Sequence, residues 1–444
     1  MKNNLIKQLS TWCVASLFTA LPLTVIAQDN NTAATSSLPL EEIEMFAQVF
    51  SKIKSDYVDA VDEKKMLLDA INGMLAGLDP HSAFLDKDSF KELRIDTNGE
   101  FGGVGIEVSA EKTGIRVVSP IEDTPADRAG VEAGDLILGI DGKSIVGQNL
   151  NEAVEKMRGE VGSAITLTIL REGTEKPYDI EIIRDVIQLT SVKTKDLGEP
   201  GYAYMRVTQF QASSAQNLKR KIEQFQEAQT INGLILDLRN NPGGVLSGAV
   251  DISDLFLEVG ADIVATHGRT DDAETAFEAE SGDLLEGAPM VVLVNNGSAS
   301  ASEIVAGALQ DHGRAIILGT TSFGKGSVQT ISQLPSGSGL KLTTARYYTP
   351  GGRSIQETGI APDILSQRSE IIKTEGRKRL REVDLDRHLV NEATPADEDK
   401  EAEKTTDDDQ AVKDWLAEDS QLREALNLLK GINLANLSGN KKAG

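Results

Sequence analysis

Residues 290–330, near the middle of the chain, contain side chains that can act together as a nucleophile and a base. Three serines, Ser298, Ser300 and Ser302, follow an apolar run, and Lys325 stands between two glycines further along. A serine hydroxyl becomes reactive when a neighbouring base takes its proton. A lysine can be that base when its surroundings lower its pKa from the usual value of about 10.4. The stretch therefore suggests Ser–Lys chemistry, but serines at a helix start are also common caps. Both interpretations remain open on these residues alone.

Two other catalytic patterns in the same stretch fail on one requirement each. Residues 319–325 match the G-x-x-x-x-G-K phosphate loop, but Gly326 stands where a Ser or Thr hydroxyl must reach Mg²⁺. Residues 322–325 match the S-x-x-K motif of penicillin-binding enzymes, which needs a helix. Gly324 and Gly326 make a helix improbable there. The only K-T-G run, residues 112–114, lies far upstream of the serine that it should follow.

The elements that must position these side chains can be predicted from the pattern of apolar residues. We expect a strand at residues 290–294, a turn at 295–300, a helix from Ala301 and a second strand at 315–318. Such an order can hold a serine at a helix N-terminus and bring a lysine back toward it.

Residues 187–340 as a whole alternate between strand and helix patterns. Strands are predicted at 203–207 and 233–239, and helices at 214–228 and 250–257. The second strand ends in Asn240-Asn241-Pro242-Gly243-Gly244. This order predicts a layered α/β domain with its chemistry at the strand ends.

Residues 97–186 have a different texture, with short β runs, tight turns and two short helices. The run "AGV-x-x-GD-x-I-x-x-I-x-G" from Ala129 to Gly142 resembles a PDZ domain, as does the order of elements. Backbone N–H groups of a glycine-rich loop can receive a terminal carboxylate while the ligand adds as a strand. The residues that we expect to form this loop are Gly102, Gly103, Val104, Gly105 and Ile106.

The first 27 residues are predicted to be a cleaved signal peptide. Lys2 and Lys7 precede an apolar run that is shorter than the roughly 20 residues needed to span a bilayer, and Val25-Ile26-Ala27 fits a cleavage site. Cleavage removes the single cysteine, Cys13, so no disulfide framework is expected. It also removes two lysines, which leaves 43 basic against 69 acidic residues. This acidity argues against nucleic acid and anionic membranes as partners. With four histidines and no HExxH motif, no metal or other cofactor is expected.

The two ends of the mature chain are predicted to be helical. Residues 40–93 show two or three helical patterns that we expect to pack on a neighbour or a second subunit, and His81 there is interpreted as structural. Residues 391–410 form an acidic linker expected to be disordered. Residues 412–434 regain helical spacing. Self-association, an adaptor contact and packing onto the chain's own core are the alternatives for that helix.

Six motifs in order resemble those of the carboxyl-terminal processing, or tail-specific, serine proteases. They are LDPHS at 78–82, the PDZ-like module, LRNNPGG at 238–244, GSASASE at 297–303, FGKGSVQ at 323–329 and ARYYTPGGRSIQ at 345–356. The resemblance runs from about Leu40 to Leu389. It implies a multidomain α/β protein with a PDZ-like β-barrel and a layered, crotonase/ClpP-like peptidase core. The expected division is 1–27 signal peptide, 28–96 helical region, 97–186 PDZ domain, 187–370 peptidase core and 371–444 linker and C-terminal helix.

The resemblance also implies a role for individual residues. Ser300 is the expected nucleophile, Lys325 its general base and Gln329 the side chain that orients the lysine. The N–H of Ala301 and an N–H from Gly243 or Gly244 would stabilise the oxyanion.

For the whole protein, the resemblance implies a periplasmic serine endopeptidase that recognises protein C-termini. The resemblance further implies that the protein forms homo-oligomers and acts on cell-envelope substrates. It also implies an adaptor lipoprotein, through which the protein would associate with the membrane. A catalytically inactive PDZ scaffold is the alternative.

Overall fold

The computed structural model describes residues 38–111, 113–121, 123–369 and 418–440. The predicted signal peptide and the predicted acidic linker, residues 391–410, lie outside the described residues. Within the described ranges, no helix combines the length and the apolar character needed to cross a membrane. The chain divides into two compact units, residues 1–70 and 71–444.

The first unit contains the helix α1 (Leu40–Asp56) and the start of α2 (Glu63–Ala76). Ile43, Phe46, Val49 and Ile53 recur at helical spacing on α1, which is why this segment forms a helix with one apolar side. All four remain more than a third exposed, and α1 buries none of its residues.

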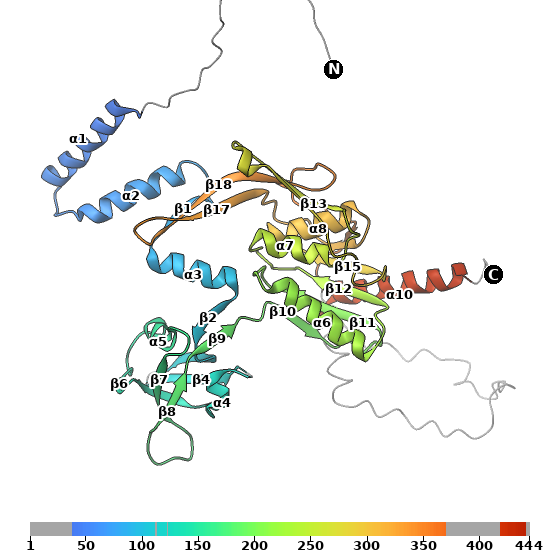
Figure 1. Cartoon of the computed structure of the whole chain (residues 1–444), viewed down its shortest axis with the longest axis horizontal. Helices are drawn as coiled ribbons and strands as arrows, with labels where there is room; N and C mark the ends of the chain where they lie inside the picture. The colour runs from blue at the N-terminus through green and yellow to red at the C-terminus, as the bar shows by residue number, and fades with distance from the viewer. Residues whose placement is uncertain (1–37, 112, 122, 370–417, 441–444) are drawn as a thin grey trace, which may run out of the picture. The chain divides into compact units, whose positions relative to one another are not determined.

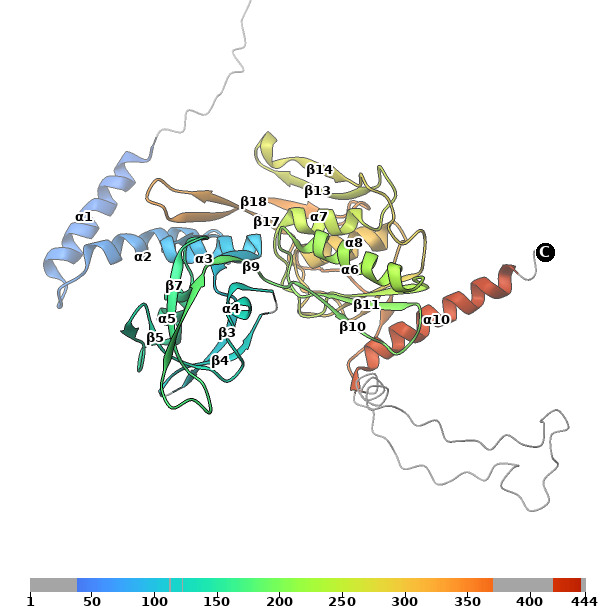
Figure 2. The same ribbon diagram turned by 60° about the horizontal axis from the view of Figure 1, so that its bottom comes forward.

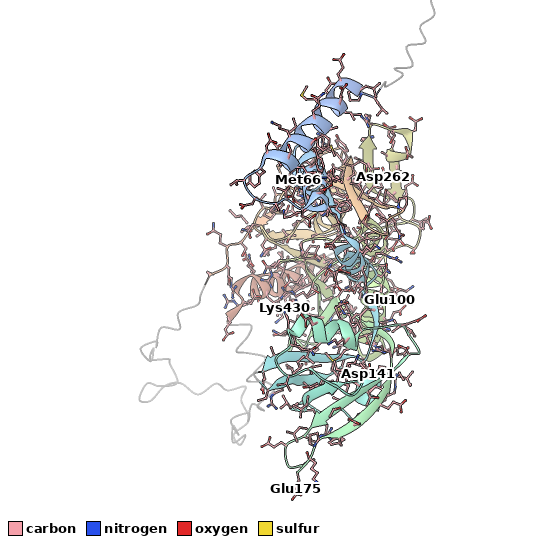
Figure 3. The ribbon with its side chains drawn as sticks, turned by 90° about the vertical axis from the view of Figure 1, so that its left-hand side faces the viewer. Met66, Glu100, Asp141, Glu175, Asp262 and Lys430 are labelled. Atoms are coloured by element: carbon pink, nitrogen blue, oxygen red, sulfur yellow. The ribbon has the colours of Figure 1, made fainter. Side chains whose placement is uncertain are left out.

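The second unit includes a six-stranded antiparallel sheet, in which β3, β4, β5, β7 and β8 follow in that order and β6 pairs with β5. Figure 2 labels β3, β4, β5 and β7 of this sheet. The β7–β8 hairpin carries Glu175 at its tip (Figure 3). Alternate residues of β7 (Ile165, Leu167 and Ile169) are fully buried in the core of this sheet, and its helix α5 contributes Ala153 and Met157. The elements of this part are β2 (Glu100–Gly103), β3 (Ile106–Glu111), β4 (Gly114–Pro120), α4 (Pro125–Arg128), β5 (Leu136–Ile140), β6 (Lys143–Ser144), α5 (Leu150–Met157), β7 (Ala164–Leu170), β8 (Tyr178–Ile183) and β9 (Asp185–Gln188).

A six-stranded sheet, in the order β10-β11-β12-β15-β16-β19, forms the centre of the α/β part. β10 runs antiparallel to β11, and the remaining neighbours are parallel. Figure 1 shows α6, α7 and α8 together and α10 apart from them. The elements are β10 (Val192–Lys195), β11 (Tyr202–Val207), α6 (Ser214–Ala228), β12 (Gly233–Asp237), α7 (Leu246–Asp254), β15 (Met290–Val294), α8 (Ala301–Asp311), β16 (Ile316–Gly319), β19 (Ile364–Leu365) and α10 (Ser420–Asn440).

Both faces of this sheet are covered, which explains why its strands read as unbroken apolar runs. Successive side chains of a strand point to opposite faces. On β12, Leu234 and Leu236 pack in the core that includes α6, α7 and α8, whereas Ile235 packs in a separate core with α10. Leu426 and Leu429 are among the α10 residues buried there. Of the alternatives for the C-terminal helix, the structure therefore shows packing onto the chain's own core.

A second sheet brings distant parts of the chain to the same strand, β18 (Gly339–Tyr348). β17 (Ser327–Gln333) lies along one edge of β18. Along the other edge lie β13 (Asp262–Gly268), which also pairs with β14 (Thr275–Glu278), and the short β1 (Ala83–Leu85). β1 directly follows the LDPHS motif and precedes α3 (Lys87–Asn98). The sequence patterns predicted helices in this region but not this strand.

Candidate active site

Ser300 lies at the N-cap of α8 in a conformation that few residues adopt. Its φ is +55° and its ψ −111°, and its exposed fraction is 5%. Such backbone strain in a residue other than glycine costs about 1–3 kcal/mol and is concentrated at functional sites. The Glu303 side chain accepts the Ser300 N–H at 2.7 Å, which helps to hold the turn. Ser300 thus enters the helix at a fixed, strained position.

The two neighbouring serines use their hydroxyl groups to build the turn. Ser298 Oγ donates to Leu238 O at 2.7 Å and accepts from Asn295 N at 3.0 Å. Ser302 Oγ donates to Asn241 O at 2.9 Å. Both side chains are fully buried. These hydrogen bonds commit the hydroxyl groups of Ser298 and Ser302 to the turn.

The Asn-Pro-Gly-Gly loop after β12 lies directly against Ser300. Asn241 O accepts the Ala299 N–H at 3.0 Å, which joins the loop to the start of α8. A Cβ atom added to Gly243 would lie 2.9 Å from Ser300 Cβ and 3.1 Å from Ala301 N. Only a glycine leaves room for a second group beside the serine.

The backbone N–H groups around Ser300 divide into engaged and free donors. Gly243 N–H donates to Asn241 Oδ1 at 2.9 Å. Among the described residues, neither Ala301 N–H nor Gly244 N–H has an acceptor. The first N–H groups of a helix have no partner within the helix, which explains Ala301. Of the two glycines named as alternatives, Gly244 is thus the one with a donor to offer.

Glu303 is a functional residue that the sequence reasoning missed. Its side chain is fully buried and joins the serine helix to the lysine loop. One carboxylate oxygen accepts the N–H groups of Ser300 at 2.7 Å and Lys325 at 2.9 Å. The other accepts the Ser322 hydroxyl at 2.6 Å and the Gly324 N–H at 2.7 Å. The sequence does contain a signal for Glu303, because a glutamate three residues after an N-cap serine is the pattern of a capping box.

Lys325 lies in the loop that leads into β17, in an environment that favours the neutral amine. Burial lowers the pKa of Lys325, and the positive charge of Lys341 lowers it further. The carboxylates of Glu303 and Asp79 act in the opposite direction without overcoming the shift. Its ammonium makes no hydrogen bond or ion pair with any residue that the structure describes, Ser300 included.

Gln329, the predicted orienting residue, lies on β17 but forms no hydrogen bond with Lys325. Its amide donates to Ser327 Oγ at 2.9 Å and lies 3.4 Å from Thr343 Oγ1. The phenol of Tyr347, on β18, interacts with Ser300. Burial raises the pKa of Tyr347, and a hydrogen bond with Ser300 opposes that shift.

The predicted chain-end loop is divided between a strand and a free segment. Gly102 and Gly103 belong to β2 and pair with β9. Val104 and Gly105 lie between β2 and β3, and in the described part of the chain their N–H groups have no acceptor. Ile106 begins β3, which lies at an edge of its sheet. Within the described ranges, no group of three metal-binding side chains occurs.

Comparison with known proteins shows the family to which the chain belongs. Residues 201–366 match the model of peptidase family S41, residues 116–171 match a PDZ domain, and residues 11–89 match the "Activating protease CtpB N-terminal domain". A carboxy-terminal-processing protease of Bartonella bacilliformis is 46% identical, over 94% of this chain and 95% of its own length. The chain belongs to the carboxy-terminal processing protease family.

Two further proteins share less sequence identity with this chain. CtpB of Bacillus subtilis is 35% identical over 75% of this chain and 69% of its own. Among solved structures, a photosystem II D1 C-terminal processing protease is 29% identical, covers 73% of this chain and 93% of its own, and has a TM-score of 0.42. The family assignment confirms a serine-type peptidase with a PDZ domain, as predicted. The domain boundaries and the roles of single residues stay predictions.

Proposed function

We propose that this protein hydrolyses peptide bonds with Ser300 as nucleophile and Lys325 as general base. The observation that carries the proposal is the position of Ser300, whose strained backbone lies beside two N–H groups without acceptors. The lowered pKa of Lys325 supports it, because a neutral amine can accept the serine proton. The missing Nζ–Oγ hydrogen bond is compatible with this role, since such bonds often tighten only when substrate is bound.

The proposed reaction has two steps. Ser300 Oγ attacks the substrate carbonyl carbon while Lys325 Nζ takes the hydroxyl proton. The N–H groups of Ala301 and Gly244 stabilise the tetrahedral oxyanion. The lysine ammonium then gives its proton to the leaving amine, and the C–N bond breaks. Water attacks the acyl group in the same way, which releases the second product and restores Ser300.

The PDZ domain is proposed to select substrates by their C-termini. Ile106 and Val108 on the edge strand β3, and Leu150 and Val154 on α5, are partly buried apolar residues packed on the domain core. A peptide that adds to β3 would place its side chains against such residues and its carboxylate near Val104 and Gly105. Proteins with free, apolar C-termini are therefore the expected substrates.

The cellular setting belongs to the same proposal. The N-terminal sequence supports export to the periplasm, where cell-envelope proteins would be the substrates. The exposed apolar residues of α1, including Ile43 and Phe46, support a homo-oligomer. An adaptor lipoprotein would bring the protease to the membrane. Cross-linking of the full-length protein in cells, followed by fractionation, tests both the location and the assembly.

One assay tests the catalytic proposal. The full-length protein is incubated with a loosely folded protein that ends in an apolar carboxylate, and with the same protein carrying a C-terminal amide. Ser300→Ala and Lys325→Ala should each lower kcat at least about 1,000-fold, as loss of a nucleophile or its base does elsewhere. Ser302→Ala, which removes a hydroxyl used in the turn, should keep at least about a tenth of the activity.

The outcomes separate the proposal from its alternative. Equal cleavage by wild type and Ser300→Ala would refute the dyad. Binding of the carboxylate substrate with no cleavage by any form would identify an inactive scaffold. Equal turnover of the carboxylate and amide substrates would show that the protein does not recognise the C-terminal carboxylate.

A further inference from the structure

The turn formed by residues 79–82, Asp79-Pro80-His81-Ser82, is tightly hydrogen-bonded within itself. Asp79 Oδ1 accepts the N–H groups of His81 at 2.7 Å and Ser82 at 2.8 Å, and Oδ2 accepts the Ser82 hydroxyl at 2.7 Å. Burial alone would raise the pKa of Asp79, but these hydrogen bonds outweigh it and hold the pKa at about 2. The carboxylate is therefore charged at every pH at which the protease is expected to work.

The same turn is attached to the strand pair β17–β18, which directly follows the loop that holds Lys325. Ser82 Oγ accepts the N–H of Thr343 on β18 at 3.1 Å, and the next residue, Ala83, pairs with Lys341. Thr343 is the β18 partner of Gln329 on β17. The Gln329 amide in turn donates to the hydroxyl of Ser327, at the start of β17. A continuous path of contacts thus joins Asp79 to the strand that follows Lys325.

The turn also acts on the lysine through its charges. The charges of Lys341 on β18, Glu303 on α8 and Asp79 in the turn act on Lys325. The charges of Lys325, Asp79 and Lys341 act on His81. The Asp79 carboxylate raises the pKa of Lys325. Burial lowers the pKa of His81, and the charge of Lys325 lowers it further, so the imidazole is favoured in its neutral form.

We propose that the Asp79–Ser82 turn is a positioning element for the catalytic lysine. Ser82 fixes the strand pair that follows the Lys325 loop, and the charge of Asp79 opposes that of Lys341 in its effect on the lysine. Asp79 and Ser82 act through Lys325 and touch no reacting atom. The inference rests on the proposed Ser300–Lys325 chemistry and extends it to a segment more than 200 residues away in sequence.

Asp79→Asn tests the charge of the turn with little change of shape. Because the Asp79 carboxylate raises the pKa of Lys325, its removal should lower that pKa, and the free amine then forms at a lower pH. We therefore expect the acid limb of the kcat/KM profile to move to lower pH. The same shift should occur in a His81→Gln background, which assigns the limb to the lysine. An unmoved limb, or one that moves to higher pH, would overturn the electrostatic role.

Asp86→Asn is the matched control. Asp86 lies seven residues further along and caps α3 by accepting the Ser89 N–H at 2.8 Å, and its charge is not among those that act on Lys325. This variant should leave the pH profile of activity in place.

Ser82→Ala tests the positional role. Loss of the hydroxyl removes the hydrogen bonds by which Ser82 links the Asp79 carboxylate to the Thr343 N–H. We expect kcat to fall between about 10- and 100-fold, because a small misplacement of a catalytic group lowers the rate by this much. KM should stay within about twofold, and Ser82→Thr, which keeps a hydroxyl, should recover most of kcat. A change confined to KM, or an unchanged kcat in protein that unfolds at a lower temperature, would show a merely structural residue.

A labelling experiment separates this inference from the proposed function. The rate of Ser300 modification by a fluorophosphonate probe is measured against pH for wild type, Asp79→Asn and Ser300→Ala. Equal labelling of Ser300→Ala would reject the nucleophile itself. Labelling that depends on Ser300, with a profile unaffected by Asp79→Asn, would keep the nucleophile and reject the turn.

Discussion

Gly243 is important to the site because it has no side chain. Its φ is +104°, and the space that a Cβ would occupy is bounded by Ala299 O at 2.8 Å and Ser300 Cβ at 2.9 Å. A methyl group there would displace Ser300 or the Ala301 N–H. Gly243→Ala should therefore lower kcat at least about 100-fold.

A matched glycine separates crowding from backbone strain in this prediction. Gly313 also has a positive φ, +62°, but nothing lies within 4 Å of an added Cβ. Gly313→Ala should cost stability of about 1 kcal/mol and leave kcat nearly unchanged. Steady-state kinetics and urea unfolding of both variants provide the measurement. A similar loss of kcat in both would refute crowding of Ser300 as the cause.

For single residues, short motifs singled out Ser300 and Lys325 in the sequence but did not predict which groups these residues contact. The GSASASE and FGKG motifs specify residue types at fixed spacing, which a sequence displays directly. The four donors to Glu303 and the partners of Gln329 depend on which loops fold together, and no local pattern encodes that closure. The choice of Gly244 over Gly243 as the proposed oxyanion donor likewise required the structure, which shows that the Gly243 N–H donates to Asn241 Oδ1.

Among the elements, α8 and the loop before β17 are joined by a single buried carboxylate. Glu303→Gln replaces one acceptor oxygen by a donor and leaves two of the four donors without a partner. Each buried group left unsatisfied costs about 1–3 kcal/mol, so unfolding free energy should fall by about 2–6 kcal/mol and kcat should fall with it. Urea unfolding with parallel kinetics measures both, and Glu278→Gln on the exposed side of β14 should change neither.

Helices and strands were predicted best where the pattern of apolar residues was long or where turn or polar residues marked its two ends. The boundaries of β15 and α6 coincide with the predicted residues, because their patterns end in turns or polar residues. The helix after the Gly-Gly loop was predicted at 250–257 but is α7, Leu246–Asp254, since it starts as soon as the glycines have turned the chain. The three-residue β1 has no period of its own and exists only because β18 offers an edge.

For the molecule as a whole, the C-terminal helix is part of the core rather than an appendage. Leu429 of α10 is fully buried, whereas Leu434, one and a half turns further along, is 67% exposed. Leu429→Asp would bury an unpaired carboxylate and should lower the unfolding free energy by at least about 3 kcal/mol. Leu434→Asp should change it by less than about 0.5 kcal/mol. Chemical unfolding followed by tryptophan fluorescence compares them, and equal effects would contradict the observed packing.

The attachment of α10 has a consequence for how the chain can be divided. At the start of the helix, Arg239 after β12 binds Asp419 at 2.7 and 2.9 Å and Gln421 at 3.0 Å, and the buried leucines follow. These contacts need no peptide connection between residue 369 and residue 418. A chain that ends at residue 410 should therefore be destabilised and should regain its midpoint when a synthetic peptide of residues 411–444 is added, in a saturable manner. The helix then behaves as a detachable ligand of its own enzyme, and its removal and return would give a concentration-controlled switch for the protease fold.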